Sequence, residues 1–413
     1  MKVWYVHPYA GGPGVGRYWR PYYFSKLWNQ AGHQSVVISA GYHHLLEPDQ
    51  KRSGNVNIQG AEYAYVPTLR YLGNGVGRML SMLIFSLMLL PFCLLQAIKR
   101  GRPDVIIYSS PHPFGVVTCW LAARFLRAKF VFEVRDIWPL SLIELGGLAS
   151  SNPLVRITGW IERFAYARAD KVVSLLPCAE PHMVSKGLRT GKFLWVPNGV
   201  DSADIQASVA DDSNEFLRYV KSLRDRGAFV VIYAGAHGDP NALEGLVRSA
   251  AILKLNGADV KIILVGKGER KAELEAIAAA DGSGLVEFFG QQPKEIVMAA
   301  LKHASAGYIS LKSEPIFRFG VSPNKLWDYM LVALPVIFAC QAGNDPVGDN
   351  RCGVSTDPES AESIASAILQ LAQLSANERV EMGIRGRDAV LQQYTYERLA
   401  KTLLDGVGGG KSS

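Results

Sequence analysis

Short apolar runs alternate with helical stretches along almost the whole chain. Runs such as 105–108 and 261–265 are nearly continuous in apolar residues, which is typical of strands that helices cover on both faces of a parallel sheet. The alternation of such strands with helices predicts doubly wound α/β domains. We expect strands at 2–7, 35–39, 61–66, 105–109, 130–134, 171–175, 193–196, 229–234, 261–265, 285–289, 306–310 and 335–339.

Residues 197–201, Pro-Asn-Gly-Val-Asp, separate two series of strands. Asn-Gly after Pro ends a strand, and 413 residues are enough for two domains. We predict a first domain over 1–198 and a second over 199–392. The small residues of 406–413 predict a flexible tail. Helices are expected near the end of the chain at 359–373, 376–392 and 395–405.

A segment of 20 residues without a charge, 79–98, has basic residues before and after it. Its length suffices to span a membrane. A single crossing, however, would separate the strands at 61–66 and 105–109, which we assign to one sheet. We therefore expect a helix in the membrane interface, with a buried crossover helix as the main alternative. Pro91 should kink or break this helix in either case.

The net charge of +7 is unevenly distributed, with +12 over residues 1–200 and −5 over 201–413. A basic half favours an anionic membrane surface, a phosphate-bearing substrate or a nucleic acid, although solvated faces without a partner are also possible. No aromatic-interleaved RNA or DNA motif is present, which disfavours nucleic acid. Five cysteines without metal or redox spacing, and a start unlike a signal peptide, predict a cytoplasmic protein.

The first candidate site is the glycine-rich stretch 7–17, which follows the first predicted strand. Gly14 and Gly16 would let the backbone approach a ligand, and a helix from about residue 18 would offer free N–H groups to an anion. The spacing matches neither the usual dinucleotide fingerprint nor the phosphate-binding loop that ends in Gly-Lys-Ser/Thr. The structural alternative is a tight strand-to-helix turn.

Polar residues follow two further predicted strands of the first domain. His112 stands between two prolines, which should hold it rigidly, and it could equally be a structural loop residue. The guanidinium of Arg135 suits a diphosphate, because its planar fork binds pairs of oxygens. The carboxylates of Glu133 and Asp136 can act as acids, bases or acceptors for sugar hydroxyls. A structural pair between Arg135 and a carboxylate is the alternative.

The last candidate lies in 314–330, where Lys325 opens a predicted helix and Asp328 follows one turn later. The helix N-terminus and the ammonium group together predict a phosphate site. The carboxylate is placed to take a ribose diol. An ordinary capped helix is the structural alternative. Because ligands of doubly wound domains bind at the carboxyl ends of the strands, we expect these sites to face a cleft between the domains.

Residues 328–337, Asp-Tyr-Met-Leu-Val-Ala-Leu-Pro-Val-Ile, resemble the E-A-M-A-x-G-x-P-V-V signature of retaining glycosyltransferases of family 4, which have the GT-B fold. The stretches 7–17, 197–201 and 264–268 resemble that family's landmarks in the same order. The resemblance covers nearly the whole chain. It implies two Rossmann-like domains that face a central cleft, with a last helix within 393–413 that crosses back to the first domain.

Two further stretches, 135–139 and 323–330, resemble the WbuB-like branch of this family, which is associated with O-antigen and other bacterial surface polysaccharides. The resemblance implies a nucleotide-sugar donor, usually UDP-linked, on the second domain, an acceptor on the first, and no required metal. With the residues above, it gives catalytic candidates His112, Glu133, Arg135 and Asp136, and donor-binding candidates Gly14, Gly16, Gly235, Asn324, Lys325 and Asp328.

The chain departs from the family pattern at three points. The paired glutamates of the family fall on Asp328 and Gly320, and Glu314 could substitute for the first only if its loop rearranged. The Arg and Lys that many members carry after the first strand of the donor domain are replaced by 234–239, Ala-Gly-Ala-His-Gly-Asp. The His that many members carry in the first domain is replaced by Arg135-Asp136.

The expected acceptor is a polyprenyl-diphosphate-linked sugar, because the apolar segment and the basic half both favour a membrane-bound anionic substrate. The protein would then be peripheral on the inner face of the cell membrane, with UDP-sugar and lipid-linked saccharide as partners and no nucleic acid. Two alternatives from other classes remain open. One is a sugar-nucleotide 2-epimerase, since the GT-B fold also serves that reaction, and the other is a non-catalytic binding subunit.

Overall fold

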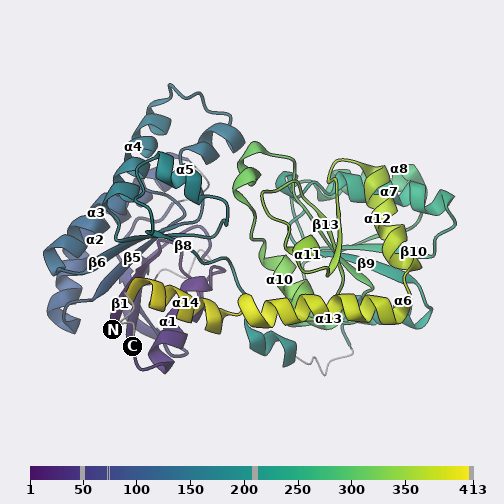
Figure 1. The fold of residues 1–413 in the computed structure, drawn as a ribbon, viewed down its shortest axis with the longest axis horizontal. Coiled ribbons are helices and arrows are strands. Elements are labelled where there is room, and N and C mark those ends of the chain that lie inside the picture. Colours follow the sequence, from purple (N-terminus) through teal and green to yellow (C-terminus); the bar gives the residue numbers. More distant parts are fainter. Residues whose placement is uncertain (47–51, 72, 74, 207–212, 409–413) are drawn as a thin grey trace. The chain divides into compact units, whose positions relative to one another are not determined.

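The computed structural model describes residues 1–46, 52–71, 73, 75–206 and 213–408, and these form two compact units. The first unit joins Met1–Asn198 to the segment from Tyr396 onwards, and the second is Gly199–Thr395. In each unit helices pack against a predominantly parallel sheet (Figure 1). The predicted doubly wound α/β architecture is therefore confirmed.

The first unit contains an eight-stranded sheet in the order β3-β4-β2-β1-β5-β6-β7-β8. All neighbouring strands are parallel except β3 and β4. The order reverses direction between β1 and β5, so the loops that follow these two strands diverge at the carboxyl edge. The strands are β1 (Lys2–Val6), β2 (Gln34–Ala40), β3 (Gly54–Ile58), β4 (Ala61–Val66), β5 (Val105–Ser110), β6 (Lys129–Val134), β7 (Lys171–Ser174) and β8 (Phe193–Trp195).

The helices of the first unit form two layers. The outer face of the sheet on one side carries α1 (Arg20–Gln30) and α14 (Tyr396–Gly408), which pack side by side (Figure 1). The indole Nε1 of Trp28 in α1 donates to the carbonyl oxygen of Ala400 in α14 at 2.8 Å, and both helices share one apolar core with the sheet. The remaining helices are α2 (Val76–Arg100), α3 (Val116–Leu126), α4 (Pro153–Arg168) and α5 (Glu180–Ser185), with a π-helical turn at Ser141–Leu145.

The apolar segment forms one continuous helix, α2, which passes through Pro91, so the predicted break does not occur. It is the helix within the described ranges that is long and apolar enough to cross a membrane. It connects two strands of one sheet and packs against α3 and β4. Its buried side contains Ser81, Phe85, Ser86, Leu89, Cys93 and Gln96. Its outward side exposes Val76, Met79, Leu80, Leu83, Leu87, Met88, Leu94, Leu95 and Ile98.

The second unit contains a six-stranded parallel sheet in the order β11-β10-β9-β12-β13-β14. The order reverses between β9 and β12, which places another topological switch point at their carboxyl ends. The strands are β9 (Phe229–Ala234), β10 (Val260–Val265), β11 (Val286–Phe289), β12 (Ala306–Ser310), β13 (Val336–Ala339) and β14 (Gly353–Thr356). The helices are α6 (Glu215–Asp225), α7 (Glu244–Leu255), α8 (Lys271–Asp281), α9 (Lys294–Leu301), α10 (Asn324–Leu331), α11 (Pro346–Asp349), α12 (Ala361–Gln373) and α13 (Ala376–Gln393).

The predicted tail is only partly accounted for. Gly406 and Gly408 belong to α14, so the tail prediction is wrong for these residues, and 409–413 lie outside the described residues. A Cβ on Gly406 would lie 2.5 Å from Cδ2 of Leu194 in β8. Glycine at this position therefore allows the last helix to approach the sheet closely, rather than marking a flexible end.

Candidate functional site

The side chain of Lys325 reaches the switch point of the second sheet from the first turn of α10. Its Nζ donates to the hydroxyl of Tyr233, the penultimate residue of β9, at 2.7 Å, and to Oδ1 of Asn241 at 3.1 Å. The ammonium also lies 4.2 Å from the centre of the Tyr233 ring. A Cβ on Gly235 would lie 2.7 Å from the same Nζ. Glycine at 235 thus makes the room that Lys325 occupies.

Lys325 combines a positive charge with uncharged neighbours. In the described part of the chain its hydrogen-bond partners are a phenol and an amide oxygen, and no carboxylate forms an ion pair with it. Burial lowers the pKa of Lys325 to about 8, so the group is still mostly protonated at neutral pH. A charge that is partly desolvated and not neutralised is suited to bind an anion such as a diphosphate.

Asp328 and Asn324, which share α10 with Lys325, have different surroundings. Asp328 lies 3.5 Å from Nζ of Lys294, which also contacts Asp204 at 2.6 Å. Burial raises the pKa of Asp328 to about 6, although Lys294 opposes this shift. Asn324 is exposed at the start of the helix. The binding of a ribose diol by Asp328 stays a prediction. A ribose hydroxyl would have to replace Lys294 as the neighbour of this carboxylate.

His237, which sequence reasoning did not assign, lies in the loop after β9. Its ring is fully buried, and neither ring nitrogen has a partner among the described residues. Its backbone bonds to Lys267 and Arg270 of the neighbouring loop, and a Cβ on Gly268 would lie 2.3 Å from its carbonyl oxygen. Burial lowers the pKa of His237 to about 4, so its ring is neutral at pH 7. A buried imidazole with open nitrogens is suited to hydrogen-bond a neutral ligand group.

Gly320, which aligns with the first of the family's paired glutamates, and Glu314, its possible substitute, lie at the two ends of one turn after β12. Gly320 ends this turn with a φ of +96°, a backbone conformation that favours glycine. Glu314 begins the turn and lines a cavity of about 500 Å³, together with Arg318 and Gln341. The carboxylate therefore faces open space in the second unit, but no contact joins it to Lys325 in the described structure.

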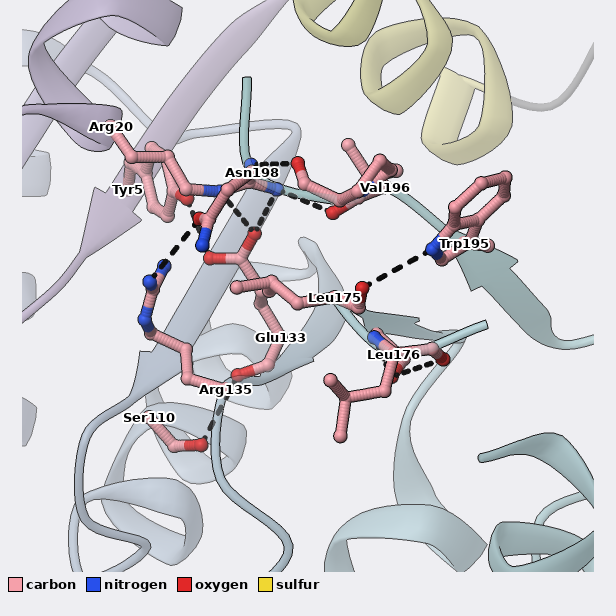
Figure 2. Close-up of polar contacts among 12 residues, drawn as sticks. Tyr5, Arg20, Ser110, Glu133, Arg135, Leu175, Leu176, Trp195, Val196 and Asn198 are labelled. Carbon is pink, nitrogen blue, oxygen red and sulfur yellow. Dashed lines mark hydrogen bonds and ion pairs between the residues drawn. The ribbon is translucent and has the colours of Figure 1, made fainter. Parts of the chain in front are cut away.

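In the first unit Arg135 follows β6 at the carboxyl edge of the sheet. Its guanidinium lies 4.3 Å from the centre of the Tyr18 ring, whose other neighbour is the stacked ring of His7 at 4.3 Å. One terminal nitrogen contacts Oδ1 of Asn198 at 3.5 Å (Figure 2), while the other is buried with no hydrogen-bond partner in the described ranges. Burial lowers the pKa of Arg135. Arg135 thus resembles Lys325 of the second unit. It is a cation fixed in position by its neighbours, and one of its nitrogens can still donate a hydrogen bond to a ligand.

Glu133, two residues before Arg135 and within β6, belongs to a different network (Figure 2). Its Oε1 accepts from Arg20 of α1 at 2.8 Å, and its Oε2 accepts from the hydroxyl of Tyr5 in β1 at 2.6 Å. Arg20 also donates to the carbonyl oxygen of Val196 at 2.9 Å. Glu133 is fully buried. This geometry favours the structural alternative for Glu133, with Arg20 rather than Arg135 as its partner.

His112 and Asp136 occupy contrasting positions at the same edge. His112 is 1% exposed, its Nε2 has no partner among the described residues, and burial lowers its pKa to about 3. A neutral imidazole with so low a pKa is a poor general base at pH 7, but it can orient a hydroxyl. Asp136 is exposed at the end of β6. Its carboxylate is accessible to a ligand, which is compatible with the predicted role.

A group of histidines around Tyr9 was not predicted. The Tyr9 ring lies 5.5 Å from His43, 4.9 Å from His44 and 5.9 Å from His112. These rings come from the loops after β1, β2 and β5, so the parallel strands bring them to one edge. The signal that identified His112, a histidine directly after a buried strand, also applies to His7.

The glycine-rich loop is tied together by its own backbone. The amide groups of Gly12 and Val15 each donate to the other's carbonyl oxygen, at 2.7 and 2.8 Å. Gly14 and Gly16 have φ of +71° and +58°, which explains glycine at both positions. Gly16 also packs against the backbone of Leu45 in the loop after β2. The anion-binding role of this loop stays a prediction.

Replacing Arg135 with glutamine should lower kcat/KM about 10²-fold while the melting temperature changes little. The reason is that Arg135 has no ion-pair partner in the described structure, so its loss leaves no buried carboxylate without a partner. Steady-state turnover and thermal unfolding would be measured on the same preparation. A melting temperature that falls as far as the activity would instead assign Arg135 a structural role.

The comparisons with known proteins agree with this architecture. Residues 14–199 match the family described as glycosyl transferase 4-like domain, and residues 228–373 match the family described as glycosyl transferases group 1. Over the residues that the structure describes, no group of three His, Cys, Asp or Glu side chains is arranged to hold a metal ion.

Individual proteins show the same likeness. The putative colanic acid biosynthesis glycosyl transferase WcaI of Escherichia coli is 25% identical over 67% of this chain and 68% of its own. The probable glycosyltransferase WbjE of Pseudomonas aeruginosa is 20% identical over 95% of this chain and 94% of its own. The solved structure of Anabaena HepE in complex with UDP has a TM-score of 0.68 and 15% identity, and the match covers 99% of this chain and 100% of HepE.

The first family match covers every strand of the first sheet except β1, and the second match covers all six strands of the second sheet. The structure shows two doubly wound units with cationic residues at the carboxyl edges of their sheets. The chain therefore belongs to the GT-B glycosyltransferases, with a family 4-like first domain and a group 1 second domain, and it is a transferase enzyme.

Proposed function

We propose that this enzyme transfers a sugar from a UDP-linked donor to a polyprenyl-diphosphate-linked glycan during assembly of a bacterial surface polysaccharide. The observation that carries the donor half is Lys325, a partly desolvated ammonium without an acidic partner in the described chain. It lies at a topological switch point, where α/β sheets bind nucleotides. The structural neighbour HepE was solved with UDP, and the relative WcaI carries a colanic acid biosynthesis name.

The proposed reaction replaces the bond between the sugar and the diphosphate with a glycosidic bond to the acceptor. The bond between C1 of the sugar and the β-phosphate oxygen breaks, and its electron pair leaves with UDP. A new bond forms between C1 and an acceptor hydroxyl oxygen, and the hydroxyl proton passes to an oxygen of the departing UDP. The departing diphosphate gains negative charge, which Lys325 is placed to stabilise in the second unit. In keeping with the family resemblance, we propose retention of the anomeric configuration and no requirement for a metal.

The acceptor half of the proposal rests on the first unit. α2 buries Phe85, Leu89 and Cys93 together with serine and glutamine, and it also exposes leucine, methionine and isoleucine. It therefore lacks the polar outer face that is usual for a soluble crossover helix. An exposed apolar stripe of this length, with Lys99 exposed in its last turn, is suited to lie in the surface of an anionic bilayer. We place the enzyme on the cytoplasmic face of the membrane, where a lipid-linked acceptor is accessible.

The test combines purified enzyme, a panel of UDP-sugars and bacterial lipid extract in detergent. We expect UDP release that requires the lipid, a lipid-linked product longer by one sugar, unchanged activity in EDTA, and an α-linked product from an α-linked donor by NMR. Transfer only to soluble acceptors would refute the proposed acceptor, and an inverted product would refute retention. Conversion of the UDP-sugar without acceptor would indicate an epimerase. UDP binding without turnover of any donor would indicate a binding subunit.

A further inference from the structure

A groove on the outer surface of α4 has the composition of a lipid headgroup site. It has a volume of about 530 Å³ and runs between α4 and the segment that follows β6. Pro139 and the buried Val155 contribute apolar lining, and Trp160 lies at its edge with 52% of its surface exposed. Arg156 and Arg163 line the same groove from positions two helical turns apart.

The two arginines of the groove carry charge that their surroundings do not neutralise. Both are exposed, and neither forms an ion pair in the described part of the chain. Glu162 is the one acidic residue of α4, and it is 4% exposed and bonded to His182 at 2.8 Å. α2 and α3 contain no acidic residue. These three helices are therefore basic and apolar and carry no exposed carboxylate. Glu144, in the π-helical turn of the segment that follows β6, is half-buried.

The helix that carries the groove belongs to the same helical layer as α2. α3 packs against both α2 and α4 (Figure 1). The rings of Trp120 in α3 and Phe164 in α4 have centres 5.2 Å apart. Phe132 of β6 contacts Tyr166 of α4, whereas its neighbour Val131 faces the core that contains α14. α4 thus lies on the opposite face of the sheet from α14. Phe125, at the end of α3, adds a side chain that is 64% exposed.

We propose that the α4 groove binds the phosphate of an anionic phospholipid in the bilayer, as a second membrane contact beside α2. Arg156 and Arg163 would bind phosphate oxygens, since a guanidinium offers paired donors. Trp160 and Ile157 would lie at the level of the headgroups, where amphipathic aromatic rings are favoured. Two contacts on one helical layer would fix the orientation of the first unit on the bilayer, which a single helix leaves free to rotate. This inference rests on the proposed membrane attachment.

The test measures binding of the full-length protein to vesicles of phosphatidylcholine alone and to vesicles that also contain the anionic lipid phosphatidylglycerol. Each arginine near an anionic surface contributes about fivefold to binding, so Arg156→Gln with Arg163→Gln should weaken binding to the anionic vesicles ~25-fold. Binding to neutral vesicles should stay unchanged. Trp160→Ala should weaken binding to both kinds of vesicle. Arg218→Gln, an exposed arginine on α6 of the second unit, is the matched control and should bind like the wild type.

Activity in detergent separates this inference from the proposed reaction. The double variant should transfer sugar in detergent at a rate within about twofold of the wild type, because its lesion lies outside the donor and acceptor chemistry. Unchanged binding to anionic vesicles would overturn the groove as a lipid site. A raised KM for the lipid-linked acceptor in detergent, with vesicle binding intact, would also overturn it by assigning the arginines to the acceptor diphosphate. A wild type that binds vesicles but transfers nothing would refute only the proposed reaction.

Discussion

Lys325→Ala should lower kcat/KM for the UDP-sugar by about 10²–10³-fold, because the variant loses a cation at the switch point of the second sheet that no carboxylate pairs with among the described residues. UDP release at subsaturating donor would measure this effect. Burial lowers the pKa of Lys325 to about 8, and the diphosphate of the donor binds the protonated ammonium. In the wild type, kcat/KM should therefore decline as pH rises through about 8, and it should be at its plateau below that pH.

The control for this prediction is Lys254→Ala. Lys254 lies in the last turn of α7, where it bonds to the carbonyl oxygen of Gly282. α7 leads from the carboxyl end of β9 to the amino end of β10, so this lysine is at the edge of the sheet away from Lys325. Its variant should keep the wild-type kcat/KM and the alkaline decline. If Lys325→Ala also kept the wild-type kcat/KM and the alkaline decline, Lys325 would not be the cation that binds the donor diphosphate.

Arg20→Met should destabilise the first unit by about 3–5 kcal/mol, since it leaves Glu133 buried without its ion-pair partner. Thermal and urea unfolding, followed by tryptophan fluorescence, would measure the loss. The double variant Arg20→Met with Glu133→Leu should recover part of it, because no unpaired charge then remains. Arg218→Met on exposed α6 should change stability by less than about 0.5 kcal/mol.

The same experiment decides between two roles of Glu133. The structural role requires that Glu133→Gln lose stability and activity together, with activity recovering in the folded fraction at low temperature. A catalytic role would show normal unfolding and a loss of kcat that temperature does not restore. The contacts with Arg20 and Tyr5 favour the first outcome.

The sequence pattern predicted the central strands well because they are buried on both faces, and burial leaves continuous apolar runs such as Val105–Tyr108. Two edge strands were not predicted. β3 alternates asparagine with apolar residues and is almost entirely exposed, and β14 is short and half-buried. Edge strands are held by backbone hydrogen bonds to one neighbour, so their side chains need not be apolar.

The sequence predicted candidate site residues only where they stand at the start of a helix or directly after a strand. Lys325 and Arg135 stand at the start of a helix and the end of a strand, and the parallel topology brings such ends to one edge. The partner of Glu133 was not predictable in this way, because Arg20 lies 113 positions away and meets it only through the packing of α1 on the sheet. His237 carries no spacing signal, and its burial depends on the loop after β10.

The position of α14 has a consequence for how the chain acquires its structure during synthesis. The second unit is one uninterrupted stretch, Gly199–Thr395, whereas the first needs Trp28, Tyr23 and the sheet to meet residues from Tyr396 onwards. A chain that emerges from its N-terminus can therefore complete the second unit before the first. The N-terminal part of the first unit is synthesised first, but it would stay incomplete, with the apolar side of α1 exposed, until α14 has been synthesised.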